Sequence, residues 1–199
     1  PPTPDPRIYA RGTASGNPPP TEQAHMEALN GARMNPPAEA ARLNIDLNEG
    51  LPANTIPPRP VQPLACSARL LEAARLHAND MLTNHYVAHS SPDGRTPGDR
   101  LDQVGYPYAL QAENLAVYYA MDPLDGAWAA LQAHDDLFLD STVAGRGHRL
   151  TILNPGLREV GAGLAAGPFE HYPHGVLLAC DLAASAEELR PFVLGVVYD

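Results

Sequence analysis

Four polar side chains stand at the boundaries of predicted elements, where their types could do chemistry: His89, Glu113, Asp140 and His148. Each lies beside an apolar segment, which is where a folded scaffold can hold a polar group toward a cleft. Two imidazoles and two carboxylates can ligate a divalent metal, or act as acid and base around a bound water. The same residue types also cap helices and tether loops through backbone N–H groups, so a structural role stays open.

Three neighbouring residues could support these side chains: Ser90, Asn114 and Arg149. Asn114 can orient Glu113 through a side-chain hydrogen bond, or it can cap a turn. Ser90 lies beside His89, but sequence neighbours seldom form a nucleophile and base, so a nucleophilic role is not predicted. The chain has no His-Glu-x-x-His motif, no Gly-x-Ser-x-Gly turn and no phosphate-binding loop. Its motifs therefore name no established catalytic mechanism.

Hydrophobic spacing and capping signals predict the helices that must position these residues. The clearest helix begins with Ser67 as N-cap, and its apolar stripe includes His77, which indicates a core or supporting role for that histidine. Thr96 and Asp99 have the spacing of a capping box, and Asp122, followed by a proline, repeats a start signal. The predicted helices cover residues 21–35, 38–43, 67–85, 96–105 and 122–138.

The periodicity changes after about residue 147, where short apolar runs are bounded by glycine or proline. Residues 160–164, 176–178 and 192–197 are predicted strands. Helices first and strands last, without alternation between them, indicate an α+β domain. We expect an antiparallel sheet of three or four strands, built from segments after about Tyr106.

Composition and charge exclude several classes of protein. The chain has 199 residues, 44% of them hydrophobic, with 13 basic residues, all of them arginine, against 23 acidic ones, for a formal net charge of -10. A general nucleic-acid binder needs the opposite sign, and no apolar run approaches the roughly 20 residues that span a bilayer. Cys66 and Cys180 can form one bridge or remain as two buried thiols.

The ends of the chain differ from its middle. Residues 1–20 hold seven prolines and no periodicity, so we interpret them as a Pro-rich linker or arm, with one domain over residues 21–199. Residues 192–199 remain strand-like up to the last position, whereas natural termini usually end in polar residues. We expect the native chain to be processed before residue 1 and to continue into further domains.

Five ordered motifs closely resemble the bacterial branch of the CAP superfamily, which contains cysteine-rich secretory proteins, venom antigens and plant pathogenesis-related proteins. The resemblance covers about residues 21–199 and is specific, because the motifs occur in the family's order. They lie at residues 89–100, 104–106, 113–116, 147–155 and 159–163, and residues 29–36 and 64–81 fit the family's opening.

The resemblance implies a three-layer α-β-α sandwich, a secreted or cell-surface setting, and a large cleft lined by two histidines and two acidic residues. His89 matches the first histidine and Glu113 the first glutamate. Asp140 falls where the second acidic residue lies, with the shorter aspartate replacing glutamate. The second histidine of the family falls at Leu177, which leaves His148 as a substitute from another direction.

This departure affects the expected metal chemistry. With Leu177 in place of a histidine, only one strong nitrogen ligand is assured, so any metal binding at His89 and His148 is expected to be weak. We expect no required cofactor, although a divalent cation (zinc, magnesium or calcium) could be held.

Three functions follow from the resemblance and the residues together. We expect a non-catalytic extracellular binding module for a small apolar ligand, a lipid, an envelope component or a protein partner, and no nucleic-acid partner. The first alternative is a metal-dependent extracellular hydrolase or protease that uses the His89 cleft. The second is a structural spacer in a longer envelope protein, which the Pro-rich arm favours.

Overall fold

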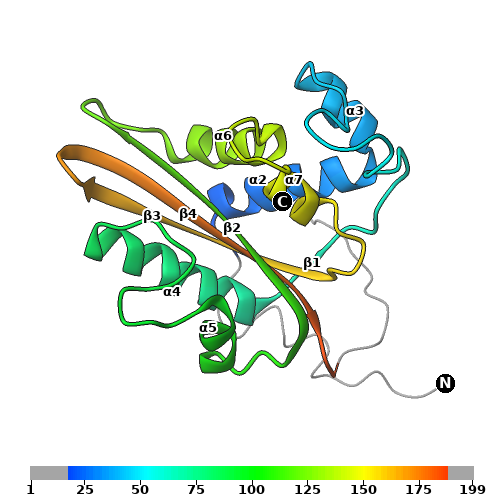
Figure 1. Cartoon of the computed structure of the whole chain (residues 1–199). Coiled ribbons are helices and arrows are strands. Elements are labelled where there is room, and N and C mark those ends of the chain that lie inside the picture. Colours follow the sequence, from blue (N-terminus) through cyan, green and yellow to red (C-terminus); the bar gives the residue numbers. More distant parts are fainter. Residues whose placement is uncertain (1–17, 188–199) are drawn as a thin grey trace.

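The computed structural model describes residues 18–187, and this part of the chain forms one four-stranded sheet between two layers of helices (Figure 1). The strand order in the sheet is β1-β3-β4-β2. The elements in chain order are α2 (Pro20–Met34), α3 (Pro36–Arg42), β1 (Ala65–Cys66), α4 (Ala68–Asn84), α5 (Pro97–Gln103), β2 (Tyr108–Ala120), α6 (Gly126–Leu139), α7 (Gly147–Ile152), β3 (Glu159–Phe169) and β4 (Tyr172–Ser185). Helices α4 and α5 cover one face of the sheet, and α2, α6 and α7 cover the other. The predicted α-β-α sandwich is confirmed.

Two of the helices begin where their capping signals predicted. Helix α4 starts directly after Ser67, although the Ser67 side chain makes no capping hydrogen bond, and it ends at Asn84, before the left-handed backbone of His85 (φ 52°). Helix α5 has the predicted capping box, in which the Thr96 hydroxyl accepts from the Asp99 N–H and the Asp99 carboxylate accepts from the Thr96 N–H. The segment between α4 and α5 is therefore fixed at both ends, and this segment carries His89.

The predicted start of α6 at Asp122 is wrong. The helix begins at Gly126, because Asp125 is the N-cap and its Oδ1 accepts the N–H groups of Ala127 (2.7 Å) and Trp128 (3.3 Å). A capping carboxylate must reach donors two or three residues ahead, and Asp125 meets that requirement here.

The sheet differs from the prediction in two respects. Strand β2, which carries Glu113, was not predicted as a strand, and it pairs with β4 in an antiparallel ladder along most of its length. The two-residue strand β1 lies before Tyr106 and pairs in parallel with β3, so the sheet is not wholly antiparallel. The predicted strand at residues 192–197 lies outside the described residues.

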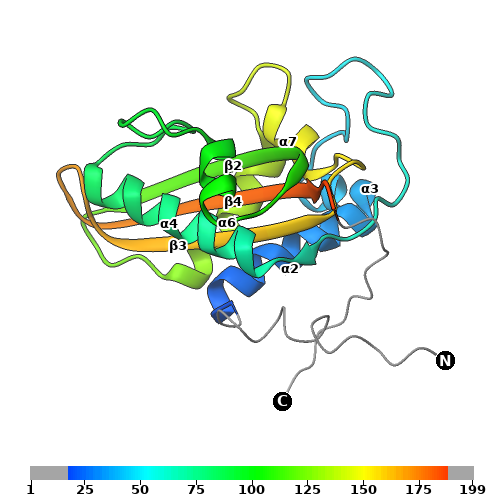
Figure 2. The ribbon, with the colours of Figure 1, turned by 90° about the horizontal axis from the view of Figure 1, so that it is seen from below.

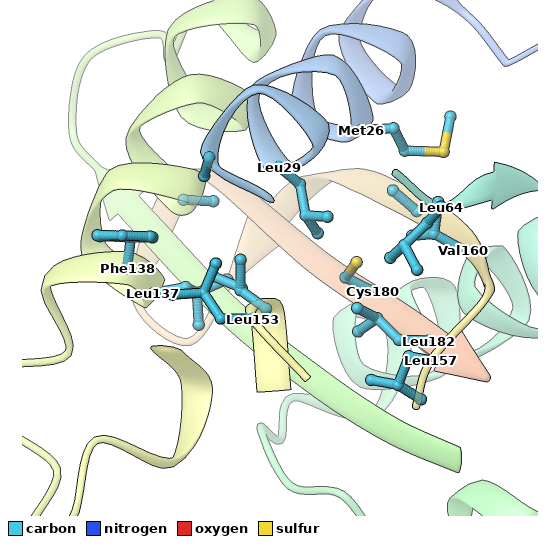
Figure 3. Close-up of a cluster of buried hydrophobic side chains, with 14 of the residues drawn as sticks. Met26, Leu29, Leu64, Leu137, Phe138, Leu153, Leu157, Val160, Cys180 and Leu182 are labelled. Carbon is cyan, nitrogen blue, oxygen red and sulfur yellow. The ribbon is translucent and has the colours of Figure 1, made fainter. Parts of the chain in front are cut away.

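Each face of the sheet has its own packing. Figure 3 shows the larger cluster, which includes Leu29 from α2, Phe138 from α6, and Cys180 and Leu182 of β4. On the other face α4 lies along β3 and β4 (Figure 2). It approaches so closely that a Cβ at Gly161 or Gly163 of β3 would overlap the backbone of α4. The ladder between β4 and β2 places the residues of the edge strand β2 relative to this packing.

The two cysteines are not bridged: Cys66 is exposed, and Cys180 is buried in the larger cluster. Burial, with the nearby acidic groups, raises the pKa of the Cys180 thiol, which therefore behaves as an apolar core group. No described helix has the length and apolar character needed to cross a bilayer.

Candidate functional site

Glu113 of β2 is the centre of a buried polar network, and 1% of its side chain is exposed. Its Oε1 lies 2.8 Å from Nδ1 of His89, which precedes α5, and its Oε2 accepts from Nη2 of Arg100, on α5, at 2.8 Å. Because a carboxylate only accepts, His89 carries its proton on Nδ1. Arg100 also donates to the His89 carbonyl at 2.8 Å. Helix α5 therefore holds both the acid and the histidine in place.

Two further buried groups complete the network around Glu113. His77 of α4 places Nε2 3.1 Å from the Ala88 carbonyl and 3.7 Å from Glu113 Oε2, and burial lowers the pKa of His77. Asp181 of β4 stands directly opposite Glu113 in the ladder. Burial and the charge of Glu113 raise the pKa of the Asp181 carboxyl well above its ordinary value, although the charge of Arg100 acts in the opposite direction. Asp181 was not singled out from the sequence.

Asp140 and His148 form a second pair of the same kind. Asp140 follows the end of α6 in a left-handed conformation (φ 50°), and only 1% of its side chain is exposed. Its Oδ1 lies 2.8 Å from His148 Nδ1, and its Oδ2 accepts the backbone N–H of His148 at 2.8 Å. The turn between α6 and α7 therefore orients His148 through both its ring and its backbone.

The four predicted cleft residues lie as two pairs on opposite faces of the sheet. Successive side chains of a strand point to opposite faces, so Glu113 faces α4 and α5, whereas Asn114 faces α7. Asn114 Nδ2 donates to the His148 carbonyl at 3.3 Å, which places the second pair at the same point along β2 as the first. In each pair Nδ1 is engaged by a carboxylate, so Nε2 is the ring nitrogen that can meet a ligand. The side chain of His89 is 54% exposed and that of His148 25%.

Residues 26–182 match the model of the Cysteine-rich secretory protein family, CAP. The chain belongs to this family. The uncharacterized protein YkwD of Bacillus subtilis (strain 168) is 27% identical to this CAP domain over 103 residues, which are 52% of this chain and 35% of that protein. This chain thus matches about a third of the length of that curated relative.

Two solved structures share the fold of this CAP domain at low sequence identity. Venom allergen-like protein 4 of Schistosoma mansoni has a TM-score of 0.52 at 14% identity, over 90% of this chain and 97% of that one. An outer surface protein of Borrelia burgdorferi has a TM-score of 0.50 at 13% identity, over 85% of this chain and 99% of that one. These likenesses concern the fold alone.

The three residues predicted to support the site differ in their burial and in what they contact. Asn114 is buried and contacts the second pair, not Glu113. Ser90 is exposed, and its neighbour Ser91 is the buried serine, with Oγ 3.1 Å from the Tyr86 hydroxyl. Arg149 is fully buried and donates to the carbonyls of Phe138 (2.6 Å) and Leu47 (3.1 Å), so it fixes the end of α6.

Leu177, where the family's second histidine was placed, is fully buried in β4. It belongs to an apolar cluster with Ala74 and Met81 of α4. This position therefore supplies packing and no polar group. His148 lies next to β2, where its backbone carbonyl accepts from Asn114.

A further set of potential metal ligands was not predicted from the sequence. Glu39, His134 and Asp135 present ligand atoms that all lie within 4.8 Å of one another. His134 Nε2 lies 2.7 Å from Glu39 Oε1, and Arg42 pairs with both Glu39 and Asp135. The guanidinium of Arg42 therefore already occupies the place of a cation between the two carboxylates. Glu39 and Arg42 lie close together in the sequence, but His134 and Asp135 come from α6, much later in the chain. The sequence therefore gave no sign of this cluster.

Two cavities lie away from both pairs. One of about 360 Å³ is lined by Arg69, Asp102 and Tyr106 among others, and one of about 320 Å³ is lined by residues that include Ile45 and Leu47. Neither is lined by His89, Glu113, Asp140 or His148.

Proposed function

We propose that this CAP domain is a secreted or cell-surface binding module that takes its ligand at the imidazoles of His89 and His148, without catalysis. One observation carries the proposal: two histidines flank the same point of β2, and a buried carboxylate holds each at Nδ1. A neutral imidazole held in this way offers Nε2 as a hydrogen-bond acceptor. The setting is supported by the likeness to an outer surface protein.

The polar character of the two histidines narrows the class of ligand. An acceptor nitrogen on each side of β2 suits a ligand that presents hydroxyl or amide N–H donors, such as an envelope component or a protein partner. A lipid or a small apolar ligand needs an apolar pocket instead, and the two cavities named above lie elsewhere. Among the ligand classes considered, we therefore favour an envelope component or a protein partner.

The bonding of the carboxylates argues against either acid acting as a general base. Glu113 accepts from His89 and Arg100, and Asp140 accepts from the ring and the backbone of His148, so neither acid is left to activate water. Ser91, a buried hydroxyl near the first pair, bonds Tyr86 and is covered by protein. A hydroxyl nucleophile needs exposure to substrate and an adjacent base.

The donor set does not fit a divalent cation. A catalytic zinc site normally has three protein ligands and a water, whereas these residues offer the Nε2 atoms of two histidines. Carboxylates that bond the other ring nitrogen do orient zinc-binding histidines in metalloenzymes, and this is the observation that favours a metal-dependent hydrolase as the second candidate. A direct metal titration separates the two candidates.

Affinity capture tests the binding function. The wild-type domain, H89A and H148A would be immobilised and exposed to the secreted proteins and the solubilised envelope fraction of the source organism. His171→Ala is the matched control, because His171 is an exposed histidine in the turn between β3 and β4. We expect a component that wild type and H171A retain and that H89A and H148A lose. A component that H89A and H148A retain as well as the wild type does would contradict the proposal. Peptide or ester hydrolysis by the wild type would also contradict it.

A further inference from the structure

Asp181 is a buried acid that the proposed function does not use. It faces α4 and α5 on the same side of the sheet as Glu113, and 3% of the residue is exposed. It is the direct ladder partner of Glu113, and its Oδ2 is buried without a hydrogen-bond partner among the described residues. Two buried carboxyl groups on neighbouring strands repel each other when both are ionised, so one of them holds a proton, which it can donate to the other.

The charges around the pair show which acid carries the proton. Arg100 from α5 is the buried cation, and its Nη2 bonds Glu113. His77 from α4 has its pKa lowered by burial, so it adds no charge near neutral pH. On β3, Gly161 stands opposite Asp181 and brings no side chain. Since His89 also bonds Glu113, the ionised acid is Glu113, and Asp181 is the neutral one.

Two other titratable groups lie close to Asp181 without changing this balance. Cys180 precedes it in β4, and burial raises the pKa of that thiol, which keeps it neutral. Glu159 of β3 lies further along the same face, and the hydroxyl of Tyr106 donates to its Oε2 at 2.5 Å. Glu159 thus has a hydrogen-bond donor of its own.

We propose that Asp181 is a positioning residue for the binding site: its carboxylic acid donates a hydrogen bond to Glu113 and so fixes the carboxylate that orients His89. The inference rests on the proposed function for the claim that His89 contacts a ligand. Without the donor, Glu113 would keep Arg100 as its cation but would turn more freely about its side-chain bonds, so it would accept from His89 Nδ1 only part of the time. The ring of His89 would then lose its single orientation.

Three variants separate positioning from packing. Asp181→Asn keeps a neutral side chain with hydrogen-bond donors at the same place, and Asp181→Leu has similar volume but no donor. Glu159→Gln is the control, because it alters another buried acid on the same face of the sheet. Infrared spectroscopy at pH 7 detects a protonated carboxylic acid, and nitrogen-15 NMR reports which ring nitrogen of His89 carries the proton.

We expect the carboxylic-acid band in the wild type and in E159Q, and its loss in D181N. We also expect D181N to keep His89 in the form protonated at Nδ1, and D181L to shift it to a mixture of the two tautomers. A wild type without the band, or D181L with an unchanged His89, would overturn the inference. If D181L does not fold, the band and its loss in D181N still decide the question. Both readouts are made without ligand, so their outcome does not depend on the result of the capture experiment.

Discussion

Glu113 is an acid removed from water, and its stability in that position depends on its partners. A buried carboxylate loses its hydration, which costs several kcal/mol unless a cation and hydrogen bonds replace it. Arg100 supplies the cation, with only 3% of its side chain exposed, and His89 supplies a second donor. The orientation of His89 is therefore a consequence of how this charge is neutralised.

Replacing Arg100 by methionine should be strongly destabilising. The substitution keeps an apolar stem but leaves Glu113 buried without its cation, for which we expect a loss of about 3–5 kcal/mol in the free energy of unfolding measured with urea. Arg95→Met is the control, because Arg95 is 40% exposed and pairs with Asp93 at the surface, so its loss should cost far less stability than the loss of Arg100. Equal effects of the two substitutions would show that Arg100 does not neutralise a buried charge.

Asp181 should make the stability of the protein depend on pH. The unfolded chain releases this proton near the ordinary pKa of 3.8, whereas the raised pKa keeps it bound in the folded protein. The folded state binds more protons above that pH, so this group makes stability fall as pH rises, by at most about 1.4 kcal/mol per pH unit. Relative to wild type, D181N should gain stability as pH rises from about 4 to 7, measured by urea unfolding. A difference that is constant with pH would contradict this.

The residues of the site were more predictable than their grouping. His89, Glu113, Asp140 and His148 were chosen from their types and motifs, but their division into two pairs depends on the alternation of side chains along β2. That strand was not predicted, because its residues are partly buried on both faces and show no clear alternation. Asp181 had a signal that could have been used: it is the one acidic residue within the apolar run of β4.

At the scale of elements, glycines in β3 set the distance between the sheet and α4. Gly161 and Gly163 lie under the backbone of the helix, where a methyl group has no space. A helix held at this distance brings His77 against Glu113. The small residues of β3 and the polar network at the edge of the sheet are therefore linked through α4.

Gly163→Ala should disturb this contact, because the new Cβ would overlap the backbone of α4 at Ala74 and Arg75. We expect a loss of about 1–3 kcal/mol or more in thermal or urea unfolding, since a backbone contact cannot yield as a side chain does. Gly167→Ala provides the comparison on the same strand, because its Cβ would meet only the flexible side chain of Leu82, at 3.3 Å. If G167A is as destabilising as G163A, the close approach of α4 is not the cause.

Elements with local signals were predicted well, and elements defined by distant contacts were not. Ser67 and Thr96 predicted the starts of α4 and α5, because a helix-start signal lies within a few residues, although only Thr96 makes a side-chain capping hydrogen bond. Strand β1 consists of two residues that become a strand only through pairing with β3. No local pattern can indicate such a strand, because its partner lies about ninety residues later in the chain.

At the scale of the whole molecule, the net charge of -10 decides which partners are excluded. Phosphate backbones repel such a surface, so we expect no saturable binding of duplex or single-stranded DNA at protein concentrations up to roughly 100 µM, the weak end of ordinary non-specific affinity. Fluorescence anisotropy with labelled oligonucleotides, beside a basic protein of similar size, measures this. Binding that weakens as salt is added would refute the expectation.

Ligand binding without a catalytic metal centre is the role proposed for the two imidazole and carboxylate pairs beside β2. Calorimetric titration of chelator-treated protein with zinc tests it most directly, with magnesium and calcium in parallel and H89A and H171A for comparison. Two Nε2 atoms are too few ligands for a tight site, so we predict no tight one-to-one binding and no hydrolysis of peptides or esters. Tight one-to-one zinc binding that H89A abolishes and H171A retains, accompanied by hydrolysis, would contradict the account and establish the enzyme.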